Sequence, residues 1–188
     1  MKDRKKIKLV QALVGAIVLT LLMQVMVLVG YTQYIWMLFL PLLLFFALGA
    51  DFKKIPEMII GYICGVIWAF LNGLVMQLFA SFSSSPIISN ILPTVIVIFL
   101  ILTVHENLLE NTIFGNIPCI FLGLSTSFFV SMLQMPLTPF HLVAFFVYGL
   151  VLAVLLVVCG MLVCRAIFGK ERAMKAIMPL PAKADKAA

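Results

Sequence analysis

The sequence predicts an all-α membrane protein, a bundle of six transmembrane helices. Hydrophobic residues make up 64% of the 188 positions and charged residues only 11%, whereas soluble domains have about 45–50% and about 25%. The 13 Lys and Arg and the 7 Asp and Glu fall in four clusters, within 2–8, 51–57, 106–110 and 165–186. Each stretch between these clusters is at least twice as long as the ~20 apolar residues that cross a bilayer core. Each stretch therefore holds two helices and a turn.

The six spans are expected at 9–30, 34–50, 56–80, 87–104, 112–133 and 140–164. The turns that join the two spans of each stretch, at 31–33, 81–86 and 134–139, carry no charge, whereas every Lys and Arg lies at a terminus or within 51–57. Because Lys and Arg next to a span are retained in the cytoplasm, both termini are expected there.

Three regions are expected along the chain: a basic cytoplasmic N-terminus at 1–8, a transmembrane domain at 9–164 and a basic cytoplasmic tail at 165–188. The net charge of +6 is explained by this topology, and the basic tails are expected to contact anionic lipid headgroups. No nucleic-acid partner is expected.

Small residues recur at every fourth position in the third and fifth spans, at a constant offset along the chain. Such residues let two membrane helices approach closely. We expect a parallel internal repeat of two helical hairpins, 34–80 and 88–134, with the third and fifth spans buried either within one subunit or at a subunit interface. A homo-oligomer is expected, because a chain this small often needs partners to enclose a pore. The packing residues are Gly61, Gly65, Ala69 and Gly73 in one span, and Gly115, Cys119, Gly123 and Ser127 in the other.

No Asp, Glu, Lys or Arg is expected at the bilayer midplane, where an ionisable group would indicate a proton or ion pathway. The polar side chains within the spans are amides and hydroxyls, and they could line a route for an uncharged solute. The alternative is that they form hydrogen bonds between helices, each worth about 0.6–2 kcal/mol. The pathway residues are Gln24, Asn72, Gln77, Asn90, Thr94, Ser125 and Thr126, of which Asn72 and Thr126 correspond in the repeat.

A second polar group is expected at the cytoplasmic boundary. His105 and Glu106 resemble the start of a zinc-protease motif, but that motif needs a histidine at position 109, which is Leu. Glu106 and Glu110 would repel each other on one helix, which favours a turn there or partners such as Lys53 and Lys54. We expect no enzyme, cofactor or metal. The boundary residues are Asp51, Lys53, Lys54, His105, Glu106 and Glu110.

Two segments carry a resemblance to a known family, Gly-Tyr-Ile-Cys-Gly-Val-Ile-Trp at 61–68 and Pro-Cys-Ile-Phe-Leu-Gly at 118–123. They resemble a family of small bacterial inner-membrane proteins typified by YcdZ, although Cys119 stands where we expect glycine. The resemblance covers the second to the sixth span. It implies a bacterial inner membrane and several spans, and it assigns no catalytic or binding residue because the function of that family is unknown.

Two functions from different classes fit these features. The first is a channel or facilitator for a small neutral or weakly polar solute, with the third and fifth spans along its route. The second is a membrane scaffold or accessory subunit that assembles through its small-residue helix faces. A polar cavity that reaches Asn72 and Thr126 would favour the first, and a dry contact between the two spans would favour the second.

Overall fold

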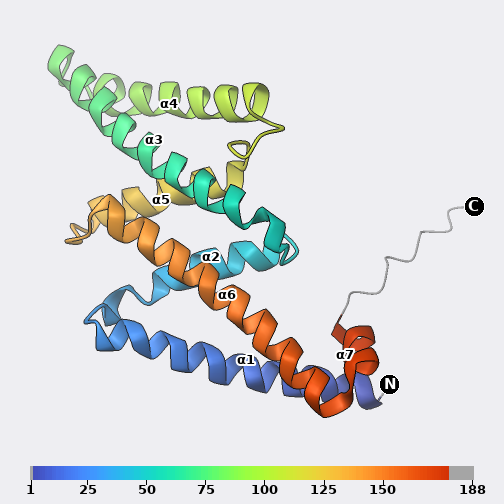
Figure 1. The fold of residues 1–188 in the computed structure, drawn as a ribbon. Coiled ribbons are helices and arrows are strands. Elements are labelled where there is room, and N and C mark those ends of the chain that lie inside the picture. Colours follow the sequence, from blue (N-terminus) through green and yellow to red (C-terminus); the bar gives the residue numbers. More distant parts are fainter. Residues whose placement is uncertain (1, 178–188) are drawn as a thin grey trace, which may run out of the picture. The chain divides into compact units, whose positions relative to one another are not determined.

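The computed structural model describes residues 2–177, and all regular structure in this range is helical. Each uncharged stretch of the sequence contains one turn, so the apolar helices follow one another in the order that the sequence predicts. The helices, coloured along the chain in Figure 1, are α1 (Lys2–Leu28), α2 (Trp36–Ala47), α3 (Ile55–Phe82), α4 (Leu92–Leu102), α5 (Ile117–Met132), α6 (Pro139–Phe168) and α7 (Lys170–Ile177). Short 3-10 helices, η1 (Thr32–Tyr34) and η2 (Phe52–Lys54), precede α2 and α3, and π-helical segments, η3 (Ile87–Ile91) and η4 (Thr103–Leu108), flank α4.

Within residues 2–177, four helical segments are long and apolar enough to cross a membrane. Two more, Thr32–Ala47 and Ile117–Met132, are apolar but shorter. These helices indicate a membrane-embedded protein, whereas the six crossings and the internal repeat stay predictions. The four long segments are Arg4–Leu28, Phe52–Phe82, Ile87–Leu108 and Pro139–Phe168.

Helix α5 is shorter than the predicted span at 112–133 because its N-terminus is capped late. The Asn116 side chain accepts a hydrogen bond from the Cys119 backbone N–H at 3.1 Å, and Pro118 occupies the first turn. A proline is favourable there, because an N–H in the first turn has no partner within the helix. The residues before Asn116 therefore form an irregular loop.

The chain forms two compact units, one of Met1–Ile35 with Val151–Ala188 and the other of Trp36–Leu150. In the first unit, Ile7 of α1, Cys164 of α6 and Ala173 of α7 form a buried cluster. Gly169 has φ +83°, a conformation that glycine adopts without strain, and it turns the chain from α6 into α7. The predicted cytoplasmic tail at 165–188 thus begins in the last turn of α6 and continues into α7, and positions 178–188 of that tail lie outside the described residues.

Close packing of α3 against α5 organises the second unit, and the two helices cross in Figure 1. A Cβ atom added to Gly65 would clash with the Ile120 carbonyl, and one added to Gly123 would clash with the Tyr62 carbonyl. A Cβ atom on Gly61 would lie 2.9 Å from the Cβ of Cys119. The two backbones therefore touch at positions where any larger residue would separate them.

The other small residues of the predicted stripes lie outside this backbone contact. A Cβ on Gly73 would meet nothing within 4 Å, and one on Gly115 would clash with the Glu110 carbonyl in the preceding loop. Ala69 of α3 packs against a buried cluster formed by α4 and α5. Because the helices cross at an angle, only part of each stripe can touch the other.

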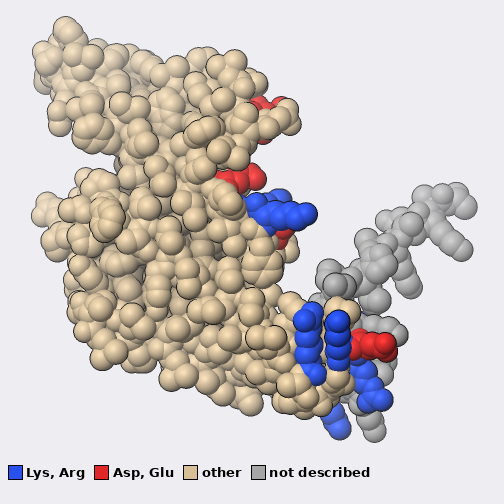
Figure 2. All heavy atoms as spheres, in the orientation of Figure 1, with Lys and Arg blue, Asp and Glu red and all other residues tan. Residues whose placement is uncertain are grey.

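The charged side chains of the second unit lie where α3 begins and where α4 ends (Figure 2). Asp51 accepts a hydrogen bond from the Lys53 backbone N–H at 2.9 Å and caps the 3-10 turn before α3. The helical segment η4 ends at Leu108, so Glu110 lies in the turn that follows. Of the two arrangements considered for Glu106 and Glu110, the structure has the turn.

Replacement of Gly65 by alanine is expected to destabilise the protein by about 1–3 kcal/mol, because the added methyl group forces α3 and α5 apart. The matched control is Gly73→Ala on the same helix, where the space is open and stability should stay equal or rise by up to about 1 kcal/mol. Unfolding of both variants in detergent micelles, followed by circular dichroism, makes the comparison. Equal effects of the two substitutions would contradict the backbone contact.

Candidate functional site

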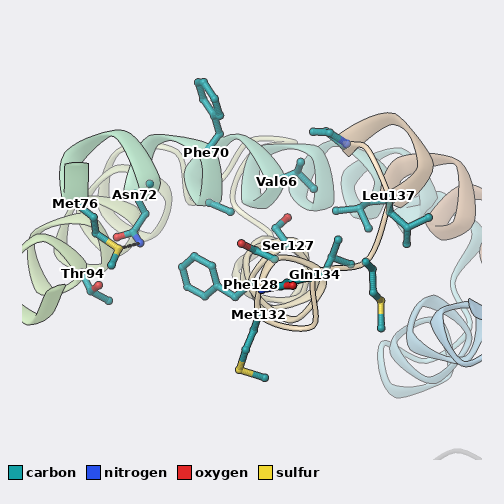
Figure 3. A pocket seen from close by; sticks show the side chains of 17 residues that line it. Val66, Phe70, Asn72, Met76, Thr94, Ser127, Phe128, Met132, Gln134 and Leu137 are labelled. Atoms are coloured by element: carbon teal, nitrogen blue, oxygen red, sulfur yellow. Dashed lines mark hydrogen bonds between the residues drawn. The ribbon is translucent and has the colours of Figure 1, made fainter. Parts of the chain in front are cut away.

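A cavity of about 720 Å³ opens in the second unit, among the ends of α3, α4, α5 and α6 that lie far from the charged residues. Figure 3 shows α3 along one side of the cavity, with side chains of α5 beneath it and Thr94 of α4 at one edge. The lining is mostly apolar and contains no Asp, Glu, Lys or Arg. Its polar side chains are Asn72, Thr94, Ser127, Ser131 and Gln134.

Asn72 is the most deeply buried polar side chain of the cavity wall, with 2% of its surface exposed. Its Nδ2 donates a hydrogen bond to the Met76 sulfur at 3.2 Å, and its Oδ1 is buried without a partner. A buried acceptor without a hydrogen bond costs about 1–3 kcal/mol. This amide is therefore a group that a ligand could satisfy.

Two hydroxyl groups of the wall donate their hydrogen atoms to their own helices. The Thr94 hydroxyl donates to the Asn90 carbonyl and the Ser127 hydroxyl donates to the Gly123 carbonyl, each at 2.8 Å. A hydroxyl has one hydrogen and two lone pairs. Each of these oxygens can still accept a hydrogen bond from the cavity.

The cavity ends toward the charged residues at Val66 of α3, Ser127 of α5 and Leu142 of α6. One helical turn further, Tyr62 stacks on Phe146 with ring centroids 4.0 Å apart, and the backbone of Gly123 touches that of Tyr62. Apolar side chains and close backbones thus form the floor of the cavity.

Thr126 belongs to this floor and not to the cavity. It is 2% exposed, its hydroxyl donates to the Leu122 carbonyl, and its side chain is hydrogen-bonded to Tyr62. The cavity therefore reaches Asn72 but not Thr126. Thr126 is one position from Ser127, and neighbours on an α-helix point about 100° apart.

The remaining predicted pathway residues lie apart from the cavity lining. Gln24 is exposed on α1 in the first unit, and Gln77, Asn90 and Ser125 are exposed on their helices in the second. Among the predicted pathway residues, only Asn72 and Thr94 line the cavity. Ser127, expected as a packing residue, lines it too. The prediction missed Ser131 and Gln134 as cavity residues, although Gln134 begins the uncharged far turn and Ser131 lies shortly before it.

A second polar cluster joins α3, η4 and the loop before α5. The Trp68 indole N–H donates to His105 Nε2 at 2.8 Å, so Nε2 is an acceptor and the imidazole is neutral. His105 Nδ1 therefore carries the hydrogen and donates to the Phe114 carbonyl, also at 2.8 Å. His105 is 4% exposed and connects two segments that are far apart in the sequence.

A neighbouring bond strengthens the same region. The Asn116 amide donates from Nδ2 to Glu57 Oε1 at 3.0 Å, while Asn116 Oδ1 caps α5. The start of α5 is thus attached to the start of α3 by a hydrogen bond to a charged acceptor, which is stronger than a bond between neutral groups. Within residues 2–177 there is no group of three His, Cys, Asp or Glu side chains that could hold a metal ion.

A family model for a protein of unknown function, DUF1097, matches residues 10–169, and the chain belongs to this family. This match supports the expected membership of a family whose function is unknown. The link to YcdZ stays a prediction. The searches of curated proteins and of solved structures found no match.

The variant His105→Leu is expected to lower stability by about 1–3 kcal/mol, because it leaves both the Trp68 N–H and the Phe114 carbonyl without a partner. Trp68→Phe should have a smaller effect, since only the imidazole loses a bond. Thermal unfolding reported by a dye that reacts with the buried thiols of Cys119 and Cys164 measures both variants. Trp36→Phe, at a side chain that is 36% exposed, is the control; a loss there equal to that of His105→Leu would contradict the cluster.

Proposed function

We propose that this DUF1097 protein crosses a bacterial cytoplasmic membrane six times and facilitates the passage of a small neutral or weakly polar solute. The six apolar helical segments and the uncharged turns between the paired segments support this topology. Both termini are then cytoplasmic by the positive-inside rule. Helix α5 has 16 residues and rises about 24 Å, so it would cross with local thinning of the bilayer.

The observation that carries the functional proposal is the cavity with Asn72 in its wall. In this topology the cavity opens toward the outside, since the charged ends of α3 and α4 face the cytoplasm. The absence of any ionised group from the lining favours uncharged solutes, because burial of a charge without a partner is costly. The layer of Tyr62 and Phe146 would be the inner gate.

The dry contact between α3 and α5 that the scaffold function predicts is present, but it lies within one chain. Gly61, Gly65 and Gly123 contact α3 or α5 of the same chain, so these small residues are not available to bind a separate helix. Apolar side chains such as Leu9 of α1 (72% exposed) and Phe99 of α4 (64% exposed) would face lipid or another copy of the chain. We therefore include a homo-oligomer in the proposal. Contacts of the basic tails with anionic lipids are also part of it, because Lys and Arg are attracted to anionic headgroups.

Thiol labelling in intact cells tests the topology. In a background without the native cysteines, Ser84→Cys in the uncharged turn should react with a membrane-impermeant maleimide added outside. Asn107→Cys, near the charged end of α4, should react only after the membrane is permeabilised. Labelling of both positions from the same side would exclude the six-crossing arrangement.

Proteoliposomes test transport with glycerol, urea and acetamide as solutes. The wild-type protein should speed light-scattering recovery after an osmotic shock several-fold over empty vesicles for at least one of the three. Asn72→Leu should remove most of this increase, while Asn111→Leu, an exposed residue in the loop before α5, should keep it. If none of the solutes enters faster than in empty vesicles, the facilitator function is wrong.

A further inference from the structure

Three of the polar side chains in the cavity wall act mainly as hydrogen-bond acceptors, which bears on the class of ligand that the cavity binds. Asn72 Oδ1 has no hydrogen-bond partner, and the hydroxyls of Thr94 and Ser127 have already donated their hydrogens to backbone carbonyls. Asn72 Nδ2 has two N–H groups, and one of them donates to the Met76 sulfur. These three side chains therefore offer three acceptor oxygens to a ligand and a single free N–H donor.

We infer that the cavity selects a small uncharged molecule that carries an N–H or O–H donor on an apolar body. The donor would bind Asn72 Oδ1. In Figure 3 the Asn72 amide hangs from α3 toward the space beside Thr94 and Phe128. Its oxygen is buried, and a turn about the soft χ2 torsion of asparagine, which breaks the Nδ2 bond to the Met76 sulfur, brings the oxygen to the ligand.

The rest of the lining fits the apolar body of such a molecule. Phe128 supplies an aromatic ring, and Met76, Met132 and Met135 also line the cavity. Methionine side chains are flexible and polarizable, so they adapt to apolar groups of different shape. An anion would find no Lys or Arg in the lining, and a cation would find no carboxylate, so either charge would be buried without compensation.

This inference rests on the proposed role of the cavity as the solute site, but it concerns equilibrium binding and can be tested without transport. Benzyl alcohol and anisole are suitable probes because they are isomers with the same ring. The first has a hydroxyl donor and the second has only an acceptor. Protein with ¹³C-labelled methionine methyl groups in micelles reports binding through the shifts of Met76, Met132 and Met135, with both probes compared at equal mole fraction in the micelle.

Benzyl alcohol is expected to bind about fivefold more tightly than anisole, the ratio that corresponds to one hydrogen bond of ordinary strength. Asn72→Leu should bring the two dissociation constants within about twofold of each other, while the matched Asn111→Leu variant should keep the preference. Equal binding of the two isomers by the wild-type protein, or a preference that survives in a folded Asn72→Leu variant, would overturn the inference. The wild-type comparison is decisive even if Asn72→Leu does not fold.

A third probe, methylammonium, checks the exclusion of charge. It should cause no saturable shift of the cavity methionines, and saturable binding tighter than that of benzyl alcohol would also overturn the inference.

The binding and transport experiments together distinguish the ligand class from the transport function. A donor preference without solute flux in proteoliposomes supports the ligand class and refutes transport. Flux without a donor preference supports transport and refutes the ligand class.

Discussion

The backbone contact between α3 and α5 is the constraint on which the second unit depends. Gly65 meets the carbonyl of Ile120, and Gly123 meets that of Tyr62, so the two helices touch without side chains between them. In a membrane there is little hydrophobic force between helices, and close van der Waals packing of small residues takes its place. The hydrogen bond from Asn116 to Glu57 joins the start of α5 to α3, and the bond between Trp68 and His105 joins α3 to η4. Both bonds satisfy polar groups that burial would otherwise leave unpaired.

This contact also determines where the cavity lies. Because α3 and α5 cross at an angle, they touch near Gly65 and separate toward the far end, where Gly73 has open space beside it. The separation leaves room for the cavity, and Asn72 comes to lie on its wall with one acceptor unpaired. The Tyr62 and Phe146 stack closes the space just where the backbones meet. The tight contact and the open site are thus two consequences of one crossing geometry.

The sequence predicted those features that depend on local composition and periodicity. The clusters of charge marked the ends of the apolar helices, the four-residue spacing of Gly61 and Gly65 indicated a close helix contact, and an amide within a span identified Asn72. Features that depend on the crossing of helices could not be read in this way. The pairing of Trp68 with His105 joins residues that are 37 positions apart. Likewise, Thr126 and Ser127 face different surroundings only because of the rotation of α5 about its axis.

Disulfide formation between α3 and α5 tests the central contact most directly. In a Gly61→Cys variant that keeps Cys119 as its only other cysteine, the two Cβ atoms would start 2.9 Å apart, and a small shift would bring them to the ~3.5–4.5 Å of a disulfide. Mild oxidation in the membrane should give a monomer with an internal disulfide, in which both thiols are protected from alkylation. Covalent dimers as the main product, or two thiols that stay reactive, would show that these helix faces do not meet within one chain.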